Sequence, residues 1–161
     1  MAEAASLYRS KLGDRVCGRQ EVSHVLFPDD EIVVPQDLLN RLLADDVPIL
    51  VPLFYRATEP HSPLIFKVGP DGEAIPFDEA EICTPPDQPL LECPGGAGTG
   101  VMLVHRDVLE AIGDRPFRYP EAGGSADLHF CQCARELGFK TFCSSAITIP
   151  QMSHGETPSP D

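Results

Sequence analysis

The sequence lacks the features that would place the protein in or across a membrane. Its apolar runs are far shorter than the roughly 20 residues that a spanning helix needs. The first residues, MAEAASLYRSKLGD, contain no basic region followed by an apolar stretch, so we expect no secretory signal. These absences predict a protein without a membrane span, and they favour the cytoplasm, where thiols stay reduced.

Clusters of basic residues are missing as well. The chain carries 25 Asp and Glu against 12 Lys and Arg, a formal net charge of −13, and its Lys and Arg are scattered along the sequence. Because this charge repels a polyanion, we expect no direct binding of nucleic acid. A phosphorylated ligand could still bind if a divalent cation mediated the contact.

Two familiar ligand-binding motifs are also absent. The six cysteines show no CxxC spacing, which argues against structural zinc and favours buried free thiols. The glycine-rich run Gly95–Gly100 has no lysine after its last glycine and lacks the GxGxxG spacing, so it is neither a Walker A nor a dinucleotide-binding loop. These glycines instead predict close backbone approach or unusual dihedral angles at a crowded site.

What the sequence does contain is an alternation of helical and strand patterns. Pro52 marks a weakened ladder or a sheet edge, and residues 69–94, rich in Pro, Gly, Asp and Glu, are expected to form a long surface excursion. The order predicts one α/β domain with a largely buried sheet over residues 1–155, and a disordered tail at 156–161. Helices are predicted over residues 2–15, 36–45, 105–113 and 125–137, and strands over residues 22–27, 47–55, 64–68, 98–104 and 140–150.

Three acidic residues, Asp29, Asp30 and Glu31, follow the first predicted strand. Ligands of such sheets gather beyond the carboxyl ends of the strands. In extended backbone Asp29 and Glu31 project to the same side, so this pair could bind Mg²⁺ or Mn²⁺. The alternative is a solvated turn in which one carboxylate serves the N-terminus of the next helix.

Two more residues are candidates for chemistry. Asp127 falls in the first turn of the helix predicted at 125–137, where the helix dipole favours an ionised carboxylate that could act as a general base. His154 follows the last predicted strand and could bind a metal through its neutral imidazole. The alternatives are an aspartate that only compensates the dipole and an unengaged surface histidine.

Taken in order, these pieces resemble the glycosyltransferase family 2 enzymes of the GT-A fold. VLFPDDEIVVPQDLLNRLLADDVPILVPLFYR (25–56) resembles the region around their DxD motif, and GTGVMLVHRDVLEAIGDRPF (98–117) resembles their later glycine-containing strand, short helix and aromatic residue. GGSADLHFCQCARELGFKTF (123–142) resembles the stretch around their Glu-Asp pair, and His154 completes the pattern. The likeness covers about residues 20–155.

The resemblance implies a GT-A-like mixed sheet with flanking helices that transfers a sugar from a nucleotide-sugar donor to a hydroxyl of a glycan or another acceptor. Asp29 and Glu31, with His154, would bind Mn²⁺ or Mg²⁺ on the donor diphosphate, and Asp127 would be the catalytic base. The substrate contacts that it implies are Asp30, Arg56, Gly98, Thr99, Gly100 and Phe117.

The chain departs from the family pattern at three points. Glu31 stands where the motif ends in Asp, Ala126 replaces the Glu of the Glu-Asp pair, and the early elements that bind the nucleotide are missing. We therefore expect a fold that is incomplete at the N-terminus, with a separate N-terminal half as a further candidate partner. Two other interpretations stay open: a degenerate, non-catalytic domain that binds a partner or a sugar, and a small metal-binding α/β protein of unrelated function.

Overall fold

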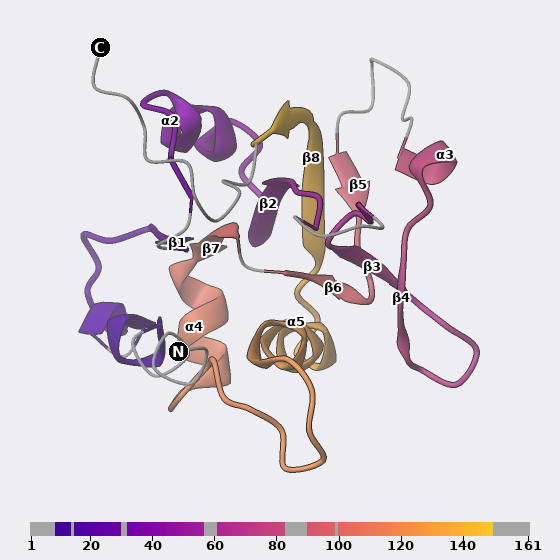
Figure 1. Ribbon diagram of the computed structural model, residues 1–161. Helices are drawn as coiled ribbons and strands as arrows, with labels where there is room; N and C mark the ends of the chain where they lie inside the picture. The colour runs from indigo at the N-terminus through magenta and orange to yellow at the C-terminus, as the bar shows by residue number, and fades with distance from the viewer. Residues whose placement is uncertain are drawn as a thin grey trace.

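The computed structural model describes residues 9–13, 15–29, 32–56, 61–82, 90–98 and 100–149. At its centre is a five-stranded mixed sheet in the order β1-β7-β2-β8-β5 (Figure 1). β1, β2 and β8 run in one direction, and β7 and β5 run in the opposite one. The strands are β1 (His24–Pro28), β7 (Val101–His105), β2 (Ile49–Leu53), β8 (Thr141–Thr148) and β5 (Leu90–Glu92).

A smaller sheet and several helices complete the described fold. The second sheet has the order β4-β3-β6, formed by β4 (Ala74–Pro76), β3 (Ile65–Val68) and β6 (Gly96–Ala97). Residues 9–13 and 15–16 are helical, in agreement with the helix predicted at 2–15. None of the helices in the described residues combines the length and apolarity needed to cross a bilayer. The remaining helices are α2 (Leu38–Leu43), α3 (Glu79–Ile82), α4 (Arg106–Ile112) and α5 (Ala126–Glu136).

The central sheet is buried on both faces. Along β7, Met102 and Val104 belong to one core cluster with residues of α4 and α5, whereas Val101 and Leu103 belong to another with residues of α2. This alternation follows from the two-residue period of a strand. Figure 1 shows the resulting layers, with α2 on one side of the sheet and α4 and α5 on the other. The predicted α/β fold, a mixed sheet with flanking helices, is confirmed.

Sequence signals at the ends of the helices predicted α4 and α5 correctly. The Ser125 hydroxyl accepts a hydrogen bond from the Asp127 backbone N–H at 3.2 Å, which caps the N-terminus of α5 as expected. α4 begins after His105, whose Nδ1 accepts from the Asp107 N–H at 3.2 Å, and it ends at Gly113. These ends depend on residues adjacent in sequence, so the sequence alone was sufficient to locate them.

One prediction about the sheets was wrong, and of the two alternatives for Pro52 the weakened ladder is the one that holds. Residues 69–94 are not only a surface excursion, because they contain β4, α3 and β5, and β5 pairs with β8 in the central sheet. Pro52 does not mark an edge either, since β2 lies between β7 and β8. The proline sits where the register shifts: Pro52 is opposite Ser144, but Leu53 is opposite Thr148. An irregular position tolerates a residue without an N–H better than a regular ladder does.

Three of the five described cysteines agree with the prediction of buried free thiols. Cys93, Cys131 and Cys143 are buried, and Cys17 and Cys133 are partly exposed. Burial raises the pKa of the Cys131 thiol to about 11 and that of Cys143 to about 12. Such thiols stay protonated near neutral pH, which favours a structural role over a catalytic one.

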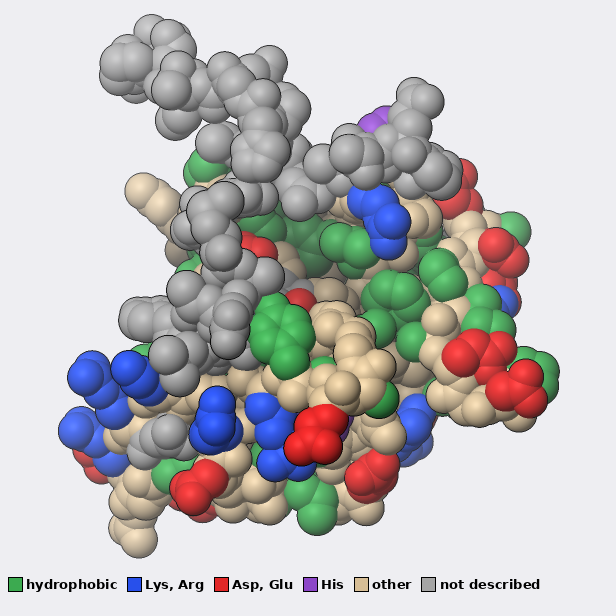
Figure 2. Space-filling model, turned by 60° about the horizontal axis from the view of Figure 1, so that its bottom comes forward, with side chains coloured by type: hydrophobic (Ala, Val, Ile, Leu, Met, Phe, Trp, Pro, Cys, Tyr) green, Lys and Arg blue, Asp and Glu red, His purple; other side chains and the backbone are tan. Residues whose placement is uncertain are grey.

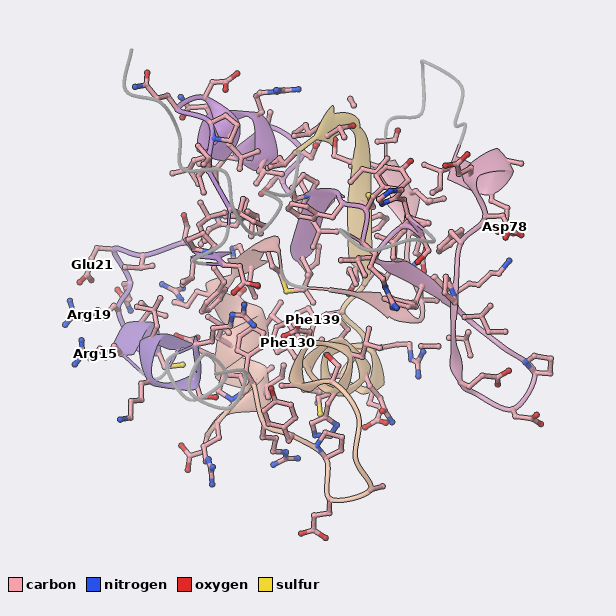
Figure 3. The ribbon with its side chains drawn as sticks, in the orientation of Figure 1. Arg15, Arg19, Glu21, Asp78, Phe130 and Phe139 are labelled. Atoms are coloured by element: carbon pink, nitrogen blue, oxygen red, sulfur yellow. The ribbon has the colours of Figure 1, made fainter. Side chains whose placement is uncertain are left out.

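Three phenylalanine rings connect the first strand to the last helix. The Phe117 ring stacks on Phe130 of α5 with centroids 4.3 Å apart, and it meets Phe27 of β1 edge-on at 5.0 Å. All three rings are buried, and Figure 3 shows Phe130 in the middle of the molecule. The stack therefore fixes where α5 begins relative to the end of β1.

We expect Phe130→Ala to lower the free energy of unfolding by about 3–5 kcal/mol, because it removes a buried ring and leaves a cavity beside Phe117. Leu137→Ala, at the exposed end of the same helix, should change it by less than about 0.5 kcal/mol. Urea unfolding followed by circular dichroism measures both. Equal losses in the two variants would show that the stack contributes little.

A histidine pair lies at the other end of β1. His24 and His105 are partners across β1 and β7, with ring centroids 4.7 Å apart at an interplanar angle of 90°. Burial lowers the pKa of His24, and the neighbouring His105 lowers it further, whereas Asp46 acts in the opposite direction. The folded protein therefore disfavours a proton on His24.

We expect acid to destabilise the protein partly through His24. An unfolded chain, in which this residue has its ordinary pKa near 6.5, binds more protons as the pH falls through that value, so the free energy of unfolding decreases. The His24→Gln variant should lose less stability than the wild type between about pH 7.5 and about pH 5.5. Chemical denaturation at the two pH values measures the difference. An identical loss in both proteins would contradict the assignment.

Candidate functional site

The candidate site lies at the edge of the central sheet where β1, β2 and β8 have their carboxyl ends. Asp29 follows β1 directly, and its backbone N–H donates to the carbonyl of Gly100, just before β7, at 2.8 Å. This bond continues the β1–β7 ladder and fixes the backbone of Asp29 at the edge. The position beyond a strand's carboxyl end is the one that the sequence predicted for this residue.

A single arginine connects Asp29 to Asp127. Arg9 donates from Nη2 to Oδ1 of Asp29 and from Nη1 to Oδ1 of Asp127, each at 3.0 Å. The Arg9 side chain is only 10% exposed, whereas those of Asp127 and Asp29 are 21% and 40% exposed. The structure thus brings a predicted metal ligand and the predicted base together, on either side of one guanidinium. We call these three residues the acidic triad.

The helix that carries Arg9 is fixed by its neighbours. The Ser10 hydroxyl donates to the carbonyl of Phe117 at 2.8 Å and accepts from its N–H at 3.2 Å. Leu12 and Val16 pack against the core on the side of α4 and α5. Because Ser10 and the apolar residues determine where the helix lies, Arg9 is placed beside the two carboxylates.

Unlike Arg9, the other basic residues at this end of the chain are exposed to solvent. Lys11, Arg15 and Arg19 are exposed, and Figure 2 shows Lys and Arg side chains at the left of the face it displays, where Figure 1 places this helix. In Figure 3 Arg15 and Arg19 are labelled at the outer edge of the molecule. Arg9 alone of these four is buried.

Arg9 is the site residue that sequence reasoning missed. It lies on the same helical face as Leu12 and Val16, three and seven residues further on, which belong to the apolar side of that helix. An arginine at an apolar position needs a buried counter-ion, and this signal was available in the sequence. What the sequence did not provide was the identity of its partners.

The predicted glycine contacts are at a crowded place, as expected. A Cβ atom on Gly100 would lie 2.8 Å from Cδ1 of Ile32 and 3.0 Å from Cζ of Phe54, so a larger residue would displace its neighbours. The N–H of Gly98 donates to the carbonyl of Leu64 at 2.8 Å, which holds this segment against the residue that directly precedes β3. The backbone therefore approaches closely here, and Gly100 is needed for that approach.

The two other predicted substrate contacts that the structure describes have different environments. Arg56 is exposed beyond the end of β2, on the same edge of the sheet as Asp29, and its carbonyl accepts from Nδ1 of His61 at 3.0 Å. Phe117 is only 2% exposed, with its ring inside the aromatic stack. A buried ring has almost no surface to offer an acceptor, which corrects the prediction that Phe117 is a substrate contact and gives it a structural role.

The predicted metal centre is only partly within the described structure. Asp30, Glu31, Thr99 and His154 lie outside the described residues, so the predicted sharing of one cation by Asp29, Glu31 and His154 stays a prediction. Within the described ranges, no group of three or more His, Cys, Asp or Glu side chains could hold a metal ion. Of the three predicted ligands the structure places Asp29 alone, and Arg9 is bound to its Oδ1.

Comparison with known proteins supports the fold but no function. No protein-family model matches this chain, and no curated protein matches it. Among solved structures, the crystal structure of A197 from STIV is similar, with a TM-score of 0.59 and 14% sequence identity. The match covers 92% of this chain and 67% of that chain. At this identity the likeness concerns the arrangement of helices and strands alone.

We expect Arg9→Met to lower the free energy of unfolding by about 2 kcal/mol, because two carboxylates would lose their shared counter-ion. The value is below the roughly 3–5 kcal/mol typical of broken buried pairs, since Asp29 is 40% exposed. Arg19→Met is the matched control, because Arg19 and its partner Glu21 are 64% and 71% exposed. Urea unfolding compares them. A loss no greater for Arg9→Met than for the control would remove the triad as a stabilising feature.

Proposed function

We propose that the protein transfers a sugar from a nucleotide-sugar donor to an acceptor hydroxyl. The observation that carries this proposal is the convergence of Asp29 and Asp127 at the carboxyl-end edge of the central sheet. The two residues come from segments far apart in sequence, and the resemblance to glycosyltransferase family 2 assigns them complementary roles at one site. The α/β fold is compatible with a ligand site at this edge.

The roles follow from the chemistry of the two carboxylates. Asp127 lies in the first turn of α5, and its carboxylate could take the proton of an acceptor hydroxyl. Asp29 would hold Mn²⁺ or Mg²⁺, with Glu31 and His154 as the other ligands. Such a cation, when bound, neutralises the charge of a diphosphate leaving group.

Other residues at this edge would contact the substrates. Gly98 and Gly100 are proposed substrate contacts from the resemblance, and Arg56, exposed beyond β2, would attract the donor phosphates. Asp30 and Thr99 remain proposed contacts from the resemblance, and a separate N-terminal half remains a proposed partner for the nucleotide. We place the activity in the cytoplasm, in keeping with the buried thiols of Cys93, Cys131 and Cys143.

The acidic triad also favours a second candidate function. Because Arg9 forms an ion pair with each carboxylate, both Asp29 and Asp127 have a cationic partner without a metal ion. A domain that has lost catalysis could keep this arrangement for stability and bind a sugar or a protein partner. The second candidate is therefore a non-catalytic domain of the same fold.

Calorimetry with a panel of UDP-, GDP- and dTDP-sugars, with and without Mn²⁺, separates the two candidates. We expect Mn²⁺-dependent binding of at least one donor by the wild type. Asp127→Asn should retain that binding but lose transfer to a hydroxyl acceptor by about 10²–10⁴-fold, because the base is removed. Asp107→Asn, a change at the equivalent turn of α4, is the matched control and should retain both.

If calorimetry detects no heat change at millimolar donor, the proposal of a sugar transferase is contradicted. The non-catalytic domain then remains as the candidate function. Binding of a donor that is equally strong with and without Mn²⁺ would retain sugar binding but remove the metal from the proposal. Loss of transfer in Asp107→Asn as large as in Asp127→Asn would show that Asp127 has no special role.

A further inference from the structure

The basic residues of the protein divide into those that have a carboxylate partner and those that do not. Six of the 12 form ion pairs of 4.0 Å or less, namely Arg9, Arg19, Arg41, Lys67, Arg106 and Lys140. Over the described ranges, no carboxylate pairs with the other six. Four of these six lie on two segments that touch each other, the N-terminal helix and the loop between α4 and α5. We call these four residues the basic band: Lys11, Arg15, Arg115 and Arg118.

Contacts between the helix and the loop assemble the basic band. Its two members on the helix are one turn apart and exposed, and its two members in the loop are exposed on either side of the buried pair Pro116 and Phe117. Ser10 of the helix makes two hydrogen bonds to the backbone of Phe117. A Cβ atom on Gly13 would lie 3.1 Å from Cγ of Pro116, so the helix packs directly on this pair. The four charges therefore border one surface, and Figure 2 shows Lys and Arg side chains from the left edge to the middle of this face.

The two loop arginines keep their full charge at this surface. Arg115 has a φ of 55°, in the left-handed region that favours glycine, yet the chain places an arginine there. Nε of Arg118 donates to Nε2 of His129 at 3.1 Å. Burial lowers the pKa of His129, and Arg118 lowers it further, so the imidazole is neutral near pH 7. A neutral partner fixes the position of the Arg118 guanidinium without cancelling its charge.

The charge of this end of the molecule is opposite to that of the whole chain. Residues 9–21 contain four Lys or Arg against two Asp or Glu, a net charge of +2 in a chain whose total is −13. In the loop, Asp114 is an exposed carboxylate beside Arg115. Salt screens charges beyond about 8–10 Å, so a negative surface in contact with the basic band meets mainly these basic groups. The acidic remainder of the protein lies farther from that surface.

We propose that the basic band docks the protein on the surface of a membrane that contains anionic phospholipids. Lys and Arg side chains form strong hydrogen bonds with phosphate oxygens, and anionic lipids attract clustered basic groups. The contact is peripheral, and it goes beyond the proposed sugar transfer, which it does not require.

Two observations favour a lipid surface as the partner. No member of the basic band lines the groove between α5 and the turn that joins β3 to β4, so the band is an open surface and not an enclosed anion pocket. Tyr119, which follows Arg118, has 41% of its surface exposed. A tyrosine ring beside basic residues is suited to the headgroup layer, because its ring is apolar and its hydroxyl is polar.

Sedimentation of the full chain with vesicles tests the proposal. The wild type should bind phosphatidylcholine vesicles that contain about 30% phosphatidylserine, and it should be released at about 0.5 M NaCl. Each basic group at such a surface contributes about fivefold, so Lys11→Gln/Arg115→Gln should bind at least about tenfold more weakly. Lys67→Gln/Lys140→Gln is the matched control, because it removes the same charge from two lysines that are paired with glutamates. It should stay within about twofold of the wild type, since neither lysine belongs to the basic band.

The band residues that are changed are exposed, so both double variants should fold as the wild type does, which circular dichroism checks. Failure of the wild type to sediment with the phosphatidylserine vesicles would overturn the proposal, and so would equal losses in the two double variants. Equal binding to vesicles of phosphatidylcholine alone would also overturn it, because charge would not be the cause. Tighter binding to a DNA duplex at the same phosphate concentration would replace the lipid surface with a nucleic acid.

Discussion

The hydrogen-bonded ion pairs that Arg9 makes with Asp29 and Asp127 are the constraint on which the candidate site most depends. They join three parts of the chain: the N-terminal helix, the end of β1 and the start of α5. Each carboxylate alone could be an ordinary surface group. Held by one buried guanidinium, they define a site with one net negative charge, and any ligand that uses Asp29 has to be considered together with Arg9.

The apolar core explains why these three charged groups meet. Asp29 comes two residues after Phe27, and Asp127 comes three residues before Phe130. Phe117 contacts both rings, and its backbone also holds Ser10, the residue next to Arg9. The distances within the acidic triad are therefore set by packing inside the core. Polar groups with such rigid support are pre-organised, as chemistry at a binding site requires.

Sequence alone was sufficient where structure is determined locally. The ends of α5 were predicted because Ser125 and Gly138 lie within one turn of the helix they bound, and the strand β7 was predicted from its continuous apolar run. β5 was missed because three residues in a stretch rich in proline and glycine become a strand only through pairing with β8, about fifty residues later. The partners of Arg9 were missed for a similar reason, since tertiary packing selects which carboxylates a buried arginine meets.

The irregular pairing between β2 and β8 has a geometric consequence for the end of the chain. Three residues of β8, which lie between the partners of Pro52 and Leu53, are not paired with any residue of β2. This extra length carries β8 forward, so that Ile149 donates to the carbonyl of Leu53 and the described chain ends beside Phe54, the ring that touches Gly100. The insertion acts as a spacer that sets where the last described residues of β8 meet β2. Deleting one of these three residues of β8 would turn the side chains that follow it in the strand to the opposite face of the sheet.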